Sequence, residues 1–220
     1  TAYEIPKRDW SSDVCSSDLA QPYCLTVHPS VAATNLRETI DLIRARPNYY
    51  TYGSSGTGGL SHLAGTLLAS MAKVQWIHVP YKGGAAGIND MLGGQIHSQF
   101  ATIIGTVQHV KAGRLRWLAV STAKRSLAAP ELPTISEAGL PGYEISGWYG
   151  IVAPVKTPRA VVELLNRKIV VALKAPEVGP KFAADGSEPV GSSVAAFDAH
   201  IKAAIVKHAR LVKESGMRAD

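Results

Sequence analysis

The chain has 220 residues, of which 46% are hydrophobic and 18% are charged, so it can bury a core in one domain or two small ones. No apolar run approaches the roughly 20 residues that a bilayer-spanning helix needs, which excludes a membrane-spanning chain. The formal net charge is +6, but the basic residues are dispersed rather than gathered in a stripe, which argues against nucleic-acid binding. A basic surface suits an anionic solute instead.

Residues 1–20 show no helical or strand period and repeat Ser-Ser-Asp within a few positions. They resemble foreign sequence joined to a gene fragment, so we exclude them from the fold; a short disordered natural extension is the alternative. They carry two basic and four acidic residues, which leaves +8 on the remainder. Cys15 lies in this leader and Cys24 in the first native strand, so we expect no native disulfide, and cysteine usage does not report the redox compartment.

From residue 21 onward, the hydrophobic pattern alternates between strand and helix. Helices are predicted from Leu36 to a stop at Pro47 and over 60–72. The alternation indicates an α/β fold with a parallel or mixed sheet wound by crossovers. The predicted strands are 25–28, 49–52, 76–79, 96–100 and 115–121.

Two further helices are predicted in the last third of the chain, after a long connection over 128–143. The first begins at Pro158, because proline is favoured in the first turn, and carries apolar residues on one face. The second runs from Ser193 to a C-terminal cap at Gly216.

Two glycine-rich loops each join a predicted strand to a helix, namely Gly53-Ser-Ser-Gly-Thr-Gly-Gly59 and Tyr81-Lys-Gly-Gly84. Glycines allow positive φ and bring backbone N–H groups close to a ligand, while the following helix offers unpaired donors and the positive end of its dipole. Two such corners close together in sequence predict one pocket for a small anion. Tight packing without a ligand is the alternative reading of each corner.

We expect hydroxyl and backbone N–H groups of these loops to hold a carboxylate. Hydrogen bonds to a charged group contribute about 1.5–3 kcal/mol each, and micromolar binding needs about 8 kcal/mol, so one lobe alone falls short. Lys82 could instead be a solvated side chain, and Trp148 and Tyr149 could form either a cleft wall or core. The expected ligand-binding residues are Ser54, Ser55, Gly56, Thr57, Gly58, Tyr81, Lys82, Gly83 and Gly84, with Ala101 and Thr102 at a strand end.

The same loops do not match enzyme motifs. Ser61 stands where the dinucleotide fingerprint needs its third glycine, and Ser54 and Ser55 lack a Gly-x-Ser-x-Gly frame. His62 is expected to cap or pack at its helix start, and the seven histidines show no metal-ligand spacing. We therefore expect no catalysis, no metal and no cofactor.

Several motifs in unbroken order over residues 22–220 resemble the Bug family of periplasmic solute-binding proteins, the receptors of tripartite tricarboxylate transporters. The joint occurrence of Tyr-Lys-Gly-Gly and Leu-Pro-Gly-Tyr is more specific than either motif alone. The motifs include Val27-His-Pro-Ser, His78-Val-Pro-Tyr-Lys-Gly-Gly, Leu140-Pro-Gly-Tyr, Trp148-Tyr-Gly and Val152-Ala-Pro.

The resemblance implies a two-lobed flytrap fold of the type II periplasmic-binding-protein kind. The chain would hold one full lobe and the C-terminal part of the other, because most of the family's first lobe has no counterpart here. It would comprise a crossover strand at 21–29, a second lobe with the ligand loops at 30–145, and part of the first lobe at 146–220. A strand at 149–153 would cross back into the first lobe. Apolar surface would be left exposed on the C-terminal helices.

The resemblance also implies a periplasmic receptor that captures a di- or tricarboxylate or a related organic acid and passes it to membrane permease subunits. The complete protein would be a monomer. Ala101 stands where many relatives place an acidic residue, which favours a carboxylate without an amine. Two alternatives remain: an α/β enzyme that uses the glycine loops for an anionic substrate, and a sensory receptor.

Overall fold

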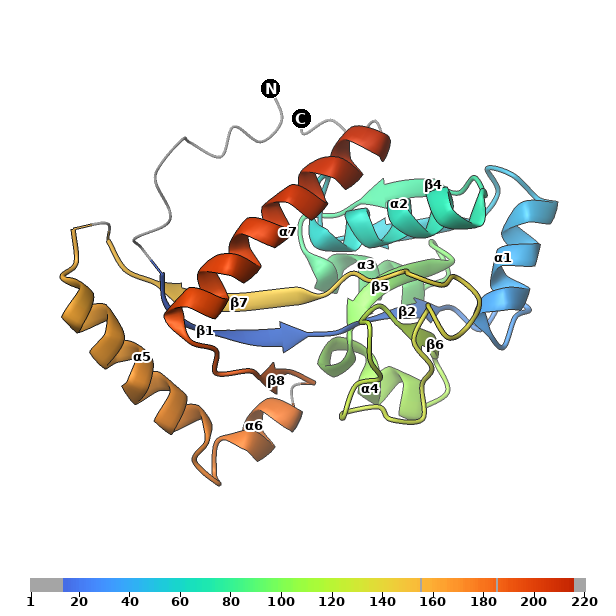
Figure 1. Ribbon diagram of the computed structural model, residues 1–220. Helices are drawn as coiled ribbons and strands as arrows, with labels where there is room; N and C mark the ends of the chain where they lie inside the picture. The colour runs from blue at the N-terminus through green and yellow to red at the C-terminus, as the bar shows by residue number, and fades with distance from the viewer. Residues whose placement is uncertain (1–13, 155, 185, 216–220) are drawn as a thin grey trace.

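Two β-sheets of different size organise the chain, and one extended path, β1 followed by β2, belongs to both (Figure 1). The computed structural model describes residues 14–154, 156–184 and 186–215. The larger sheet has the order β4-β3-β5-β2-β6, formed by Ile77–Pro80, Thr51–Ser54, Ser98–Thr102, Tyr23–Val27 and Arg116–Val120. The smaller sheet has the order β7-β1-β8, formed by Gly147–Val152, Val14–Gln21 and Glu188–Pro189.

The larger sheet is mixed, as the sequence predicts. β3 runs parallel to β4 and to β5, whereas β2 runs antiparallel to β5 and β6. The carboxyl ends of β3, β4 and β5 therefore share one edge with the amino end of β2, where Tyr23 pairs with Thr102. Ligands of open α/β sheets bind outside the carboxyl ends of the strands, so this edge is the place to look for a site.

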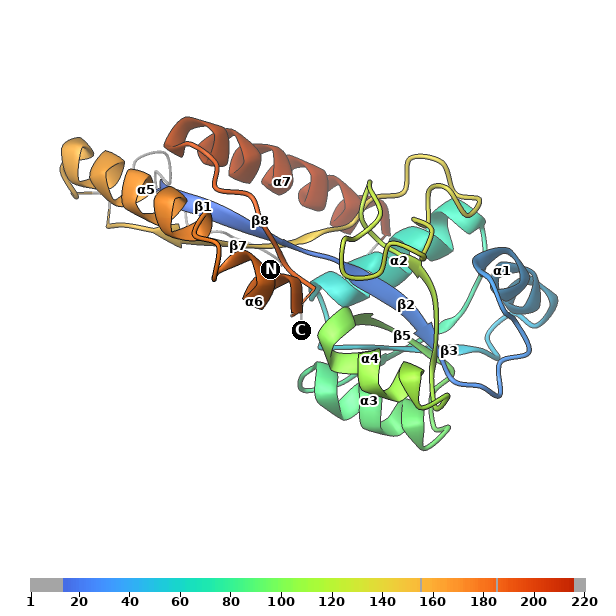
Figure 2. The same ribbon diagram turned by 90° about the horizontal axis from the view of Figure 1, so that it is seen from below.

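Helices cover both faces of the larger sheet. α1 (Leu36–Ala45) and α2 (Leu60–Ala72) pack on one face, while α3 (Gly84–Leu92) and α4 (Ile103–Lys111) lie on the other (Figure 2). Side chains of a strand alternate between faces, so Phe100 enters the core under α1 and α2, and its neighbour Ala101 packs under α3.

The smaller sheet is flanked by α5 (Arg159–Leu173) and α7 (Val194–Ser215), which both contact β1, with α6 (Gly179–Ala184) beside β8. Large apolar side chains stay exposed here, including Ile151 at 52% and Val171 at 69% of full exposure. This confirms the apolar surface expected on this part of the chain. No helix among the described residues combines the length and apolar character that crossing a bilayer requires.

The prediction that residues 1–20 contain no strand is wrong for residues 14–20, which form most of β1. β1 pairs with β7 through Leu19 and Tyr149, with register irregularities along its first half. Serine and aspartate have low strand propensity, so the pairing rather than the local sequence makes this strand. Only Pro22 separates β1 from β2. Residues 1–13 and the predicted cap at Gly216 lie outside the described residues.

The helix predicted over 60–72 is confirmed as α2, whereas several strand ends are displaced. The strand predicted at 49–52 occupies 51–54, because the chain turns after α1 through Asn48, whose φ is 57°. The strand predicted at 96–100 occupies 98–102, and the strand predicted at 25–28 occupies 23–27. The lobe boundaries predicted at 30–145 and 146–220 stay predictions.

Candidate ligand-binding site

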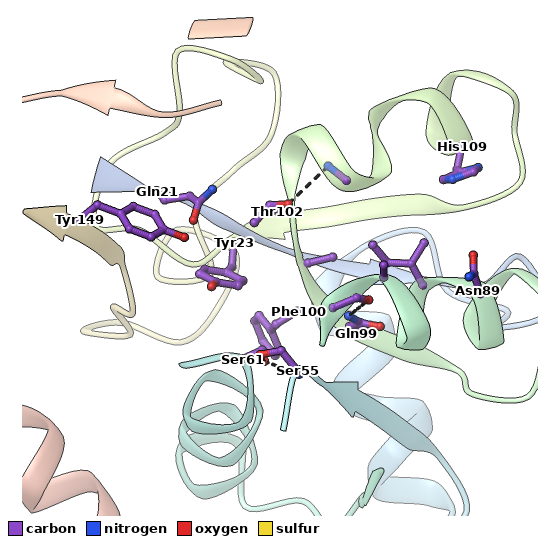
Figure 3. Close-up of a pocket in the computed structure, with 15 residues that line it drawn as sticks. Gln21, Tyr23, Ser55, Ser61, Asn89, Gln99, Phe100, Thr102, His109 and Tyr149 are labelled. Carbon is purple, nitrogen blue, oxygen red and sulfur yellow. Dashed lines mark hydrogen bonds between the residues drawn. The ribbon is translucent and has the colours of Figure 1, made fainter. Parts of the chain in front are cut away.

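A cavity of about 450 Å³ lies at the carboxyl edge of the larger sheet, next to the smaller sheet (Figure 3). Its volume is in the range of about 300–1,000 Å³ that small-molecule sites occupy. β5, α3 and α4 form one side of it, and the other side receives Gln21, Tyr23 and Tyr149 from the crossing between the sheets. The cavity therefore has walls from both parts of the fold.

Four of the predicted site residues line this cavity, namely Ser55, Gly84, Ala101 and Thr102. The backbone N–H of Ser55 donates to Ser61 Oγ at 2.9 Å, and the two hydroxyl oxygens lie 3.0 Å apart. The first glycine loop is thus fastened to the first turn of α2, and two hydroxyls stand together at the cavity wall (Figure 3).

The other predicted residues lie outside the cavity lining, and several of them shape the loops. Gly56, Gly58 and Gly83 have φ of 137°, 76° and 117°, values that favour glycine. Ser54 is fully buried, and its Oγ accepts from the Gly56 N–H at 3.2 Å. As ligand-binding residues, this group stays a prediction: Ser54, Gly56, Thr57, Gly58, Tyr81, Lys82 and Gly83.

A stack of two imidazole rings supports the first loop. The rings of His62 and His78 lie 3.7 Å apart and nearly parallel, and the Gly58 N–H donates to His62 Nδ1 at 3.0 Å. Burial lowers the pKa of both rings, and His62 adds to the lowering at His78, which reaches about 4. Both rings are therefore neutral near pH 7. The expectation that His62 caps or packs at its helix start is confirmed.

The second loop presents the open amino end of α3 to the cavity. Its N-cap residue, Gly83, has no side chain to accept from the first turn, and Gly84 and Ala85 line the cavity. The Tyr81 N–H donates to the Ser54 carbonyl at 3.0 Å, which joins the two loops. Burial and the hydrogen bond to Asp90 raise the pKa of Tyr81 to about 12, so its hydroxyl stays protonated.

Gln99 on β5 ties the amino end of α3 to the larger sheet. Its Nε2 donates to the Gly84 carbonyl at 3.0 Å, while its Oε1 is buried and has no hydrogen-bond partner among the described residues. A Cβ at Gly87 would collide with Oε1, and one at Gly53 would lie 3.2 Å from it. The Gln99 amide therefore favours glycine at position 87, whereas at position 53 the closer obstacle is the Ile96 side chain, at 2.6 Å.

One buried hydroxyl joins the two chain segments that cross between the sheets. Ser121 Oγ accepts from the Tyr23 N–H at 3.2 Å and donates to the Ile145 carbonyl at 2.6 Å. The Ser121 backbone bonds the same two residues, each at 2.8 Å. Both crossings are therefore fixed to the end of β6.

The lining of the cavity combines apolar surface with hydroxyl, amide and imidazole groups. None of the described residues that line it is Asp, Glu, Lys or Arg. The positive potential comes from helix amino ends, since α3 is open there and α4 is capped by Thr102, whose Oγ1 accepts from the Gly105 N–H at 3.3 Å. Within the described residues, no group of three or more His, Cys, Asp or Glu side chains could hold a metal ion.

Nine lining residues were not predicted from the sequence, whereas Phe100 belongs to the strand end expected to line the cleft. Asn89 lies one turn after Ala85 and His109 one turn after Gly105, so helical spacing from the predicted loop and strand end could have found them. Gln21 and Tyr23 come from the crossing segment, which carries no motif, whereas the cleft-wall reading of Tyr149 agrees with its position. The unpredicted residues are Gln21, Tyr23, Ser61, Ala85, Ile88, Asn89, Gln99, Gly105 and His109.

Comparison with protein families gives a match to the Tripartite tricarboxylate transporter family receptor over residues 13–217. A UPF0065 protein from the tcbD-tcbE intergenic region of Pseudomonas sp. is 37% identical over 172 residues, which are 78% of this chain and 51% of that protein. Protein BugT of Bordetella pertussis is 30% identical over 197 residues, which are 90% of this chain and 60% of that protein. The chain thus spans between half and two thirds of these relatives.

Solved structures show the same architecture. R. palustris Rpa4515 with adipate superposes with a TM-score of 0.87 at 32% identity, over 98% of this chain and 73% of that one. The periplasmic binding protein BugD superposes with a TM-score of 0.84 at 27% identity, over 100% of this chain and 75% of that one.

Proposed function

The chain belongs to the tripartite tricarboxylate transporter receptor family, as the motif resemblance indicates, and from this premise we propose that it binds a small carboxylate in the cavity between its sheets. The ligand would be a di- or tricarboxylate or a related organic acid without an amine next to the bound carboxylate. The bound acid would be passed to membrane permease subunits, and the receptor would act in the periplasm.

The observation that carries this proposal is an anion-binding corner without any acidic side chain. The open first turn of α3 and the paired hydroxyls of Ser55 and Ser61 line one cavity. Helix amino ends with free N–H groups bind carboxylates. Hydrogen bonds to a charged group contribute about 1.5–3 kcal/mol each, so the roughly 8 kcal/mol of micromolar binding needs three or four of them, shared between this corner and the opposite wall. The adipate held by Rpa4515, which is 32% identical to this chain, supports the same ligand class.

Closure of the two sheets over the ligand is the proposed mechanism. Gln21, Tyr23 and Tyr149 contribute one wall from the crossing, and the loops contribute the other. A ligand that touches both walls gains its full set of contacts only when they are close together, so it favours the closed arrangement.

Isothermal titration of the chain with citrate, adipate and glutamate tests the proposal. We expect heat with at least one amine-free acid, and a loss of at least about tenfold in affinity when Ser55→Ala and Ser61→Ala are combined. Ser70→Ala, an exposed serine near the far end of the same helix, is the matched control and should bind as the unchanged chain does. A chain that is folded by circular dichroism but binds none of the acids would refute the proposal.

A further inference from the structure

The cavity continues as a groove along α3 and α4, away from the proposed carboxylate position. Its lining residues on α3 are Gly84, Ala85, Ile88 and Asn89, and those on the α4 side are Thr102, Gly105 and His109. These spacings place each set on one face of its helix. The cavity is therefore longer than a single carboxylate requires.

The middle of the groove is apolar and is kept open by a glycine. A Cβ at Gly105 would lie 3.3 Å from the Ile88 side chain and 3.1 Å from Thr102 Oγ1. Ile88 and Ala101 form the apolar floor and are largely buried. Any larger residue at position 105 would narrow the groove at this point, so an unbranched hydrocarbon chain fits it best.

The far end of the groove is polar again, with the Asn89 amide and the His109 imidazole (Figure 3). Neither side chain has a hydrogen-bond partner among the residues that the structure describes. No Asp or Glu stands among the described lining residues, so a ligand ammonium group would find no counter-charge there. A carboxylate, in contrast, can accept from the amide and from the imidazole.

From these observations we infer that Asn89 and His109 form a distal subsite for the second carboxylate of a linear diacid. This inference rests on the proposed function, because the first carboxylate is assigned to the open end of α3. It adds a length requirement and two specificity-determining residues to that function.

The helix geometry sets the length of the diacid. Asn89 lies five residues beyond Gly84, and His109 lies seven beyond Thr102, so the groove advances about 7.5–10.5 Å at about 1.5 Å per residue. Carbon–carbon bonds of about 1.5 Å advance an extended chain by roughly 1.3 Å each. About six to eight carbon–carbon bonds therefore span the groove, compared with five in adipate, seven in suberate and three in succinate, so the longer diacids are favoured over succinate.

The test is titration of the full chain with adipate, suberate and succinate, with hexanoate as the monoacid of matched length. We expect adipate or suberate to bind at least about tenfold more tightly than hexanoate and succinate. His109→Ala should weaken the longer diacids by at least about tenfold and hexanoate by less than about twofold. Gln108→Ala, its exposed neighbour on α4 outside the groove, should change neither.

Asn89→Asp provides a second variant, because its carboxylate would repel a distal carboxylate while leaving hexanoate unaffected. Thermal unfolding of each variant checks that the fold is retained. Equal effects of His109→Ala on adipate and hexanoate would overturn the inference, as would tight hexanoate binding by the unchanged chain. Failure of the unchanged chain to bind any acid would instead refute the proposed function, and the distal subsite with it.

Discussion

Replacement of Gln99 by methionine should raise the stability of the fold and weaken ligand binding. Gln99 is 1% exposed and ties β5 to the amino end of α3 through the bond from its Nε2 to the Gly84 carbonyl. Its Oε1 has no partner among the described residues. Methionine has nearly the same shape and volume, so it fills the same space without the buried acceptor or the donor.

The expected change in stability is a difference of two opposing contributions. An unsatisfied buried acceptor costs about 1–3 kcal/mol, while a neutral hydrogen bond stabilises by about 0.5–1.5 kcal/mol. Gly84 is a partly exposed residue, so we expect water to replace the lost donor at its carbonyl. We therefore expect Gln99→Met to raise the free energy of unfolding by about 1 kcal/mol, which for a chain of this size raises Tm by about 2–4 °C.

The affinity for the ligand should fall while stability rises. The first turn of α3 loses its attachment to the sheet, so the ligand must order this turn when it binds. We expect adipate to bind several-fold more weakly in titration calorimetry, with stability measured by urea unfolding. Gln99→Glu is the control: its buried carboxylate would face the Gly84 carbonyl without a donor and should lower stability by several kcal/mol. A Gln99→Met chain that is less stable by more than about 1 kcal/mol, or that binds adipate unchanged, would contradict the reasoning.

Three further outcomes are expected. Gly65→Ala should destabilise the fold by about 2–4 kcal/mol in urea unfolding, because its Cβ would collide with the Tyr52 ring. Gly93→Ala is the control and should be nearly neutral, because its Cβ meets only ordinary contacts at 3.6 Å. Equal losses of stability in the two variants would be inconsistent with this packing. The pKa of His78 is about 4 in the folded chain and 6.5 when unfolded, so between pH 4 and pH 6.5 the unfolded chain binds a proton that the folded chain does not. Stability should therefore be highest above pH 6.5 and fall as the pH drops toward 4, and His78→Gln should flatten that fall; an unchanged pH profile would show that His78 does not cause it. In a Cys15→Ser background, Cys24 should resist thiol reagents until the protein unfolds, because burial raises the pKa of this fully buried thiol, and rapid labelling of the folded chain would contradict that.

Local sequence patterns predicted the elements that are determined by residues close together in the chain. The helix over 60–72 follows from its apolar spacing and from the glycines before it, and both boundaries agree with α2. The strand ends depend on partners far away in sequence, so the strand predicted at 49–52 moved to where Thr51 pairs with Ile77. β1 was missed for the same reason, since Tyr149 and its neighbours supply the pairing that Ser-Ser-Asp lacks locally.

The sequence predicted only part of the site, because some of its residues lie in glycine-rich loops and others lie inside regular strands and helices. Ser55 and Gly84 belong to glycine loops, whose composition marks them in the sequence. Gln99 and His109 face the cavity from inside regular elements, where a polar residue carries no local sign of its role. Gln21 lies in the predicted crossover strand at 21–29, where no motif marks a ligand contact.

Pro22 is the single residue between β1 and β2, and it lacks an N–H. It therefore donates no hydrogen bond to either sheet, and the ladders of the two sheets end on its two sides. When the second crossing turns as well, between Ile145 and Gly147, a change of backbone torsion at Pro22 can alter the angle between the sheets while every ladder bond in both of them stays intact. The opening motion of the receptor would then require little enthalpy, and its amplitude would be limited by contacts across the cavity rather than by the stiffness of the strands.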